Sequence, residues 1–236
     1  MFIPSSTFPT PPIAPPKTHP TPALFWWLVF SLMGLALIPT LWTELDFAAA
    51  AWARDTGAVE WWWIRLINAY VPLVFRITMV GMLLVWMVLR LTQRGKRWHM
   101  TLAFVVLTGA FGPGVVVNEV FKEHWHRARP YQVQEFGGDK QFSRAGIITD
   151  QCYNNCSFVS GHTACGFFLA SLLLIETTTR RRRLWAAAGM VAGGLVGFAR
   201  MVDTAHWLSD VLWAGPITLL SSWVAWKIIL RWYPPT

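Results

Sequence analysis

Three short motifs in the second half of the chain bring together basic, imidazole and carboxylate side chains. Each motif is weak evidence alone, because a basic residue at a membrane helix end often reaches toward lipid headgroups without any further role. In combination they supply three positive groups, two imidazoles and one carboxylate. The residues are Lys122 and Arg129 in "KEHWHRARP", Ser160, Gly161 and His162 in "VSGHTA", and Arg200, His206 and Asp210 in "ARMVDTAHWLSD".

The chemistry that suits this set is phosphoryl transfer, in which a protein supplies positioning, charge stabilisation and proton management. Lys122, Arg129 and Arg200 can hold the nonbridging oxygens of a phosphate, the arginines through planar forks. Gly161 lets the backbone approach closely, and the start of the helix after it offers free N–H groups to an anion.

The two histidines are expected to have different roles. On a helix, His206 and Asp210 would share one face, so the carboxylate could take the proton of one ring nitrogen and leave the other free to attack phosphorus. That attack gives a phosphohistidine. His162 has no carboxylate at this spacing, and could protonate the leaving alkoxide and then activate water. Two alternatives remain: a satisfied buried pair, and a metal site, which is disfavoured because no third ligand has zinc-like spacing.

Composition identifies a membrane protein, because 54% of the 236 residues are hydrophobic, only 14% are charged and 16 are Trp. In such a chain a net charge of +8 indicates cytoplasmic loops more readily than a nucleic-acid surface. No nucleic-acid partner, obligate protein partner, cofactor or metal is expected. Six apolar spans predict an all-α, polytopic six-helix transmembrane bundle: Ala23–Trp42, Val71–Leu91, Trp98–Phe121, His162–Thr179, Leu184–Ala199 and Trp207–Leu230.

Basic clusters predict the orientation of these spans. They follow the second span ("RLTQRGKR"), the fourth ("TTTRRRR") and the last, which puts those ends and both termini in the cytoplasm. The three motifs then lie on the exported face. The segment Thr43 to Tyr70, with its "WWWIRLINAY", is expected to contain an interfacial amphipathic helix. Residues 1–22 are proline-rich and read as a disordered cytoplasmic tail without a cleaved signal peptide, and 23–236 as a single membrane domain.

At the three motifs the chain resembles the type 2 phosphatidic acid phosphatase (PAP2) superfamily, whose patterns are K-x6-R-P, P-S-G-H and S-R-x5-H-x3-D. The resemblance implies a six-helix membrane fold, metal-independent dephosphorylation, a phosphohistidine at His206 and an acid role for His162. It also implies phosphate binding by Lys122, Arg129, Ser160, Gly161 and Arg200. Val159 replaces the motif proline, and Ala199 replaces the motif serine and so removes one hydrogen bond to phosphate.

The loop before His162 contains "QCYNNC", and the exported side of a membrane would permit a disulfide between Cys152 and Cys156. Two free thiols are the alternative, while Cys165 falls inside a span and is expected to pack there. The stretch "NCSFVSGH" resembles bacterial lipid A phosphatases within the superfamily.

The hypothesis is a phosphatase of a bacterial inner membrane that faces the periplasm and acts on a lipid phosphate. Candidate substrates are lipid A, undecaprenyl diphosphate, phosphatidylglycerol phosphate and phosphatidic acid, and the sequence does not choose among them. Two rivals stay open: a phosphotransferase that passes the group to a second lipid, and a non-catalytic transporter or lipid-binding protein. The spans argue against a soluble relative of the haloperoxidases.

Overall fold

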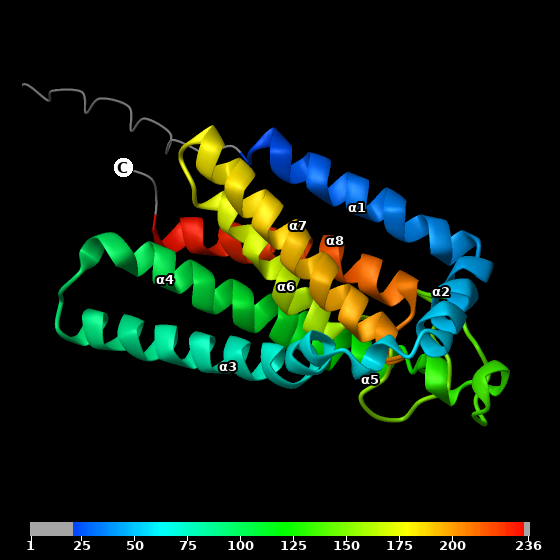
Figure 1. The fold of residues 1–236 in the computed structure, drawn as a ribbon. Helices are drawn as coiled ribbons and strands as arrows, with labels where there is room; N and C mark the ends of the chain where they lie inside the picture. Colours follow the sequence, from blue (N-terminus) through cyan, green and yellow to red (C-terminus); the bar gives the residue numbers. More distant parts are fainter. Residues whose placement is uncertain (1–20, 234–236) are drawn as a thin grey trace, which may run out of the picture.

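The computed structural model describes residues 21–233, so the predicted tail lies almost wholly outside the described residues. Within this range the chain is helical, with no strand (Figure 1). The α-helices are α1 (Ala23–Leu41), α2 (Glu44–Asp55), α3 (Trp62–Leu91), α4 (Lys96–Gly109), α5 (Lys122–His124), α6 (Gly161–Ser171), α7 (Thr179–Val202) and α8 (Leu208–Trp232). A π-helix η2 (Ala110–Phe121) joins α4 to α5, and 3-10 turns are η1 (Ala58–Glu60), η3 (Pro130–Gln132), η4 (Gln134–Phe136) and η5 (Leu172–Leu174).

Five helices are long and apolar enough to cross a membrane: α1, α3, the continuous run α4–η2–α5, α7 and α8. The sixth apolar segment, α6 with η5, is shorter. The predicted all-α polytopic bundle is therefore confirmed. The short helix packs chiefly against α7 and α8 and is largely buried, so protein rather than lipid surrounds it.

Two predicted boundaries are wrong. The "WWWIRLINAY" stretch forms the first turns of α3 instead of a separate interfacial helix, because the chain breaks earlier, at Gly57, whose φ is 61°. The separate helix in this region is α2, with the sequence "ELDFAAAAWARD". Helix α7 begins at Thr179, after a Thr178 N-cap, so the four arginines of "TTTRRRR" are helical rather than part of a loop.

The middle of the third span departs from α-helical geometry. Pro113 has no N–H to donate, and the chain continues around it as the π-helix η2. The side-chain amide of Asn118 donates to the carbonyl oxygen of Pro113 at 2.7 Å, which satisfies that carbonyl. Asn118 thus stabilises the irregular segment that leads directly into Lys122.

The bundle has two chemically distinct ends (Figure 1). The α3–α4 connection, the α6–α7 connection and the end of α8 lie at one end, and they carry the basic clusters around Arg94 and Arg181. Helix α2, α5 and the long loop between α5 and α6 lie at the other end. All three sequence motifs belong to this second end.

Close packing of α6 against α7 depends on glycines, and Gly189 provides a test. A Cβ at Gly189 would lie 2.3 Å from the Ala170 backbone nitrogen, whereas nothing lies within 4 Å of a Cβ at Gly194. We expect Gly189→Ala to lower the free energy of unfolding by about 2 kcal/mol through overpacking. Gly194→Ala should leave it unchanged or raise it, because alanine favours helix. Unfolding in detergent micelles measures both, and equal stabilities would contradict the packing described.

Candidate active site

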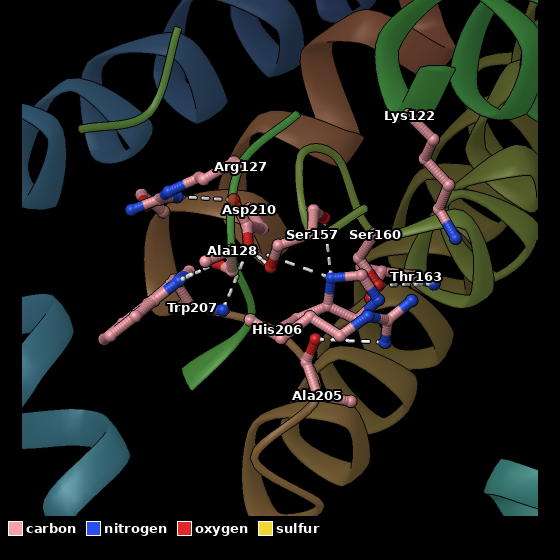
Figure 2. A network of polar contacts seen from close by, with 12 residues as sticks. Lys122, Arg127, Ala128, Ser157, Ser160, Thr163, Ala205, His206, Trp207 and Asp210 are labelled. Atoms are coloured by element: carbon pink, nitrogen blue, oxygen red, sulfur yellow. Dashed lines mark hydrogen bonds and ion pairs between the residues drawn. The ribbon is translucent and has the colours of Figure 1, made fainter. Parts of the chain in front are cut away.

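The predicted site residues gather where the α5–α6 loop meets the α7–α8 turn (Figure 2). The link is direct in the backbone, since Ser160 N–H donates to the carbonyl oxygen of Asp210. Within the turn, Ala205 N–H donates to the carbonyl oxygen of Arg200. The eight residues come from three separate parts of the chain: the region after η2, the start of α6, and the α7–α8 turn with the end of α7 and the beginning of α8.

His206 is buried, and its hydrogen bonding defines its tautomer. Its Nδ1 lies 2.8 Å from the carbonyl oxygen of Ser157. A carbonyl can only accept, so Nδ1 carries the proton and a neutral ring keeps its lone pair on Nε2. That Nε2 is buried and has no hydrogen-bond partner among the described residues. The geometry therefore presents an unoccupied nucleophilic nitrogen.

The electrostatic surroundings keep this ring neutral. Burial lowers the pKa of His206 well below its ordinary value of 6.5, and the charges of Arg129, Lys122 and Arg200 lower it further, while Asp210 opposes them. A neutral imidazole is the form that can attack phosphorus. The same positive charges would attract an anionic phosphate to the site.

Asp210 reaches His206 in a different way from the one predicted. Helix α8 begins at Leu208, so His206 precedes it and the two residues do not share a helix face. Their closest atoms, His206 Nδ1 and Asp210 Oδ2, are 3.8 Å apart. Asp210 instead accepts hydrogen bonds from the hydroxyl of Ser157 and the backbone N–H of Trp207. Asp210 thereby holds Ser157 and Trp207 in place around His206, and the Ser157 carbonyl oxygen orients the imidazole ring.

Arg127, which the sequence analysis did not single out, occupies the centre of this network. It is fully buried and forms ion pairs with Asp210 and, at 2.8 Å, with Asp46 of α2. It also donates to the Ser143 carbonyl oxygen and the Ser209 hydroxyl, each at 2.8 Å. A buried guanidinium needs such complete pairing, because leaving it unpaired would be very costly.

Asp46 caps α8 from a distant part of the chain. Its carboxylate accepts from the backbone N–H of Ser209 at 2.8 Å and from the Ser209 hydroxyl at 2.6 Å. Burial raises the pKa of Asp46, and the Arg127 charge and the Ser209 hydrogen bonds act against that rise. Helix α2 is thus connected both to the long loop and to the first turn of α8.

Aromatic side chains cover this network. The Arg127 guanidinium lies over the rings of Phe142 and Trp207, 5.4 and 5.5 Å from their centroids. Phe47 of α2 packs against both rings, and the Trp207 indole N–H donates to the Ala128 carbonyl oxygen at 2.8 Å. The cluster excludes water from the ion pairs and so strengthens them.

Asn155 holds two of the predicted phosphate ligands. Its side-chain oxygen accepts from Lys122 Nζ at 2.9 Å, and its carbonyl oxygen accepts from Arg129 Nη2 at 2.6 Å and Nε at 3.2 Å. Arg129 Nη1 also donates to the Ala205 carbonyl oxygen, next to His206. The structure thus brings Lys122 and Arg129 together through one uncharged residue.

The loop around Asn155 is closed by a disulfide between Cys152 and Cys156, whose Cα atoms are 5.6 Å apart. Asn155 has a φ of 49°, a left-handed conformation that asparagine tolerates better than most residues. His126 Nδ1 lies 2.7 Å from the Cys152 carbonyl oxygen and fastens the same loop to the segment after α5.

Arg200, near the end of α7, keeps one donor free. Its Nη1 donates to Asp203 at 2.8 Å, while its buried Nε has no partner among the described residues. Buried donors without partners are rare in proteins, and a substrate oxygen is one explanation for such an atom. The two departures from the family pattern, Val159 and Ala199, are both fully buried in apolar clusters.

The first turn of α6 forms the remaining wall. Ser160 is its N-cap and accepts from the Thr163 N–H at 3.4 Å, which leaves the N–H groups of Gly161 and His162 as donors at the positive end of the helix. A Cβ on Gly161 would lie 2.8 Å from the Asn118 side-chain oxygen, so a larger residue here would displace the Asn118 side chain. His162 Nε2 lies 3.3 Å from the Asn68 carbonyl oxygen of α3.

Sequence reasoning therefore missed Asp46, Arg127, Ser157 and Asn155. Arg127 stands two residues before Arg129, and the K-x6-R-P spacing that selects Arg129 as a predicted phosphate ligand assigns no role to Arg127. Residues 21–233 contain no group of three or more His, Cys, Asp or Glu side chains that could hold a metal ion.

Comparison with known proteins agrees with the motifs. Residues 98–234, more than half of the chain, match the PAP2 superfamily. The chain belongs to the PAP2 superfamily. The resemblance inferred from the three motifs is thereby confirmed.

Three relatives of the chain are named lipid A 4'-phosphatase. The protein of Francisella tularensis subsp. novicida (strain U112) is 37% identical over 135 residues, 57% of this chain and 61% of that protein. The Rhizobium leguminosarum protein is 36% identical over 48% of this chain and 49% of its own length. The Rhizobium etli protein is 31% identical over 78% of this chain and 74% of its own length. The match thus spans about half to three fifths of the first two relatives. No solved structure matches the chain.

The Asp46 contacts generate a stability prediction. Asp46→Ala leaves Arg127 with one carboxylate and α8 without its cap, and we expect it to lower the free energy of unfolding by about 3 kcal/mol. The matched control on α2 is Asp55→Ala, which removes an exposed ion pair with Arg54 and should change the value by less than about 0.5 kcal/mol. Unfolding in micelles measures both variants. Similar small effects would mean that Asp46 does not support Arg127.

The Asn155 contacts generate a binding prediction. Asn155→Gly keeps the left-handed backbone and the carbonyl that holds Arg129, but removes the acceptor for Lys122. We expect the Kd for inorganic phosphate, measured by calorimetry in micelles, to rise by at least about tenfold, in line with the loss of one charge-assisted hydrogen bond. Asn154→Gly alters the exposed neighbour and should keep the wild-type Kd. An unchanged Kd for Asn155→Gly would contradict the positioning role.

Proposed function

We propose that this PAP2 protein is a lipid phosphate phosphatase of a bacterial inner membrane, that its active site faces the periplasm, and that lipid A is its substrate. The observation that carries the proposal is the buried His206, with Nδ1 against the Ser157 carbonyl oxygen and Nε2 unpaired beside three cationic groups. A lone-pair nitrogen in an electropositive pocket suits attack on a phosphate.

In the first step His206 Nε2 attacks phosphorus, forming a P–N bond as the P–O bond to the lipid breaks. Lys122, Arg129, the free Nε of Arg200 and the N–H groups at the start of α6 stabilise the charge on the nonbridging oxygens. His162 gives its proton to the leaving oxygen. A bound phosphate dianion beside the ring favours the imidazolium form that this transfer needs.

In the second step water replaces the histidine. His162, now neutral, takes a proton from the water as its oxygen bonds to phosphorus, and the P–N bond breaks to release inorganic phosphate and neutral His206. The Ser157 carbonyl oxygen and the Asp210 carboxylate lie on the Nδ1 side and stabilise the positive charge of the phosphorylated ring.

The orientation follows from charge. Arg180 to Arg183 and the Arg94 region lie at the end opposite the site, and cytoplasmic ends of membrane proteins carry the excess of Lys and Arg. The catalytic end then faces the periplasm, where a disulfide between Cys152 and Cys156 persists. The names of the three relatives support lipid A as the substrate.

The test is phosphate release by the detergent-purified protein from lipid A, undecaprenyl diphosphate, phosphatidylglycerol phosphate and phosphatidic acid, with EDTA present. We expect fastest release from lipid A, no effect of EDTA, and at least a thousandfold loss of kcat in His206→Gln. Quenching in alkali, in which the P–N bond of a phosphohistidine survives, should trap a phosphorylated wild-type protein and no phosphorylated variant.

His124→Gln is the matched control, because His124 is exposed and its ring bonds to the Val120 carbonyl oxygen, one turn earlier in η2. It should retain wild-type turnover. Phosphate transfer to a second lipid without free phosphate would replace the hydrolase proposal with the phosphotransferase. Turnover that survives in His206→Gln would overturn the covalent mechanism.

A further inference from the structure

A groove leads from the candidate site along the inside of α3. It has a volume of about 390 Å³ and lies between α3, the π-helix η2 and the start of α6. Lys122 and His162 line the end of the groove next to the candidate site, called its upper end, and Met79, Val80 and Ala110 line the opposite, lower end. The polarity thus changes from cationic to apolar along one continuous cavity.

Arg76 lines the groove between these two ends. It is exposed and lies inside α3, a span whose apolar window has no buried residue. No ion pair joins it to an acidic side chain among residues 21–233. Its position is costly, because an arginine in the body of a membrane helix opposes insertion, and such residues are usually functional.

The position of Arg76 along α3 indicates which part of a bound lipid its guanidinium would contact. It stands eight residues, about 12 Å along the helix, beyond Asn68, whose carbonyl oxygen lies 3.3 Å from His162 Nε2. Two turns of helix thus separate Arg76 from the residue that contacts His162, which places the Arg76 backbone deeper along the groove than the residues proposed to hold the phosphate. No Asp or Glu side chain lines the groove, so no carboxylate there neutralises the Arg76 guanidinium. Its N–H groups can therefore donate to acceptor oxygens of a ligand.

We propose that Arg76 is a specificity-determining residue that binds the uncharged oxygen acceptors, carbonyl and hydroxyl, in the acyl-linkage region of the lipid substrate. This inference rests on the proposed function, because it takes the phosphate of the same molecule to sit at His206. The planar fork of arginine can donate to two such oxygens at once. The apolar lower end then receives the beginning of an acyl chain, and the irregular η2 segment with Pro113 and Gly114 forms the opposite wall.

The test compares two phosphate monoesters in mixed micelles. Lipid A carries acyl-linkage oxygens, whereas hexadecyl phosphate carries its phosphate on a plain alkyl chain. We expect Arg76→Leu to raise the KM for lipid A about tenfold, with kcat within twofold, and to leave the Ki of hexadecyl phosphate as a competitive inhibitor within twofold. Arg76→Lys, which keeps the charge but loses the fork, should fall between.

Arg90→Leu is the matched control at the other end of α3 and should behave as wild type in both measurements. Misfolding does not explain the expected result, since leucine enters a membrane helix more readily than arginine and the melting temperature of Arg76→Leu should not fall. An equal rise of the KM and the Ki, or a rise of neither, overturns the role of Arg76 while leaving the phosphatase intact. Failure of the wild-type protein to release phosphate from lipid A overturns the proposed function itself, and the inference with it.

Discussion

The buried pairing of Arg127 with Asp46 and Asp210 is the interaction on which the rest of the site depends. It joins three segments that are far apart in the chain: α2, the α5–α6 loop and the first turn of α8. From Asp210 the network continues through the Ser157 hydroxyl to the Ser157 carbonyl, and from there to His206 Nδ1. Each group in this series uses its neighbours to satisfy its own buried polar atoms, so the orientation of the ring is maintained by the whole series.

The same network explains how a site built from cations keeps a neutral histidine. Arg127 lies behind Asp210 and is compensated by two carboxylates, whereas Lys122, Arg129 and Arg200 act on His206 with their positive charge and help to lower its pKa. Binding of a phosphate anion lowers the net positive charge of the pocket. It thereby favours the protonated form of His162, which is the proposed proton donor. In the proposed mechanism, one arrangement therefore serves the nucleophile before the substrate arrives and the acid after it arrives.

The sequence was informative where chemistry demands a particular residue type. An anionic phosphate favours cationic ligands and a close backbone approach favours glycine, so Lys122, Arg129 and Gly161 could be singled out by type and spacing. Hydrophobic runs predicted the spans, because a helix that crosses a bilayer must be apolar over about 20 residues. The sequence analysis missed Arg127 and Asp46, because the two residues are 81 positions apart and pair only through the tertiary fold, which no local sequence pattern predicts. The expected helix face shared by His206 and Asp210 failed because α8 begins between them, at Leu208.

Among residues 21–233 four Lys and Arg side chains are buried, and their partners follow a rule of charge. Arg127 is paired with carboxylates, which cancel its field and make it a structural element. Lys122 and Arg129 are held by the side-chain and main-chain oxygens of Asn155, which accept hydrogen bonds without cancelling the positive charge. Arg200 is intermediate, since it pairs with Asp203 through Nη1 and keeps Nε free. A carboxylate in place of Asn155 would hold the same two side chains but would compete with the phosphate for them. The uncharged side chain and the main-chain carbonyl of Asn155 thus fix both cations in position and, in the proposed mechanism, leave their charge available to a substrate.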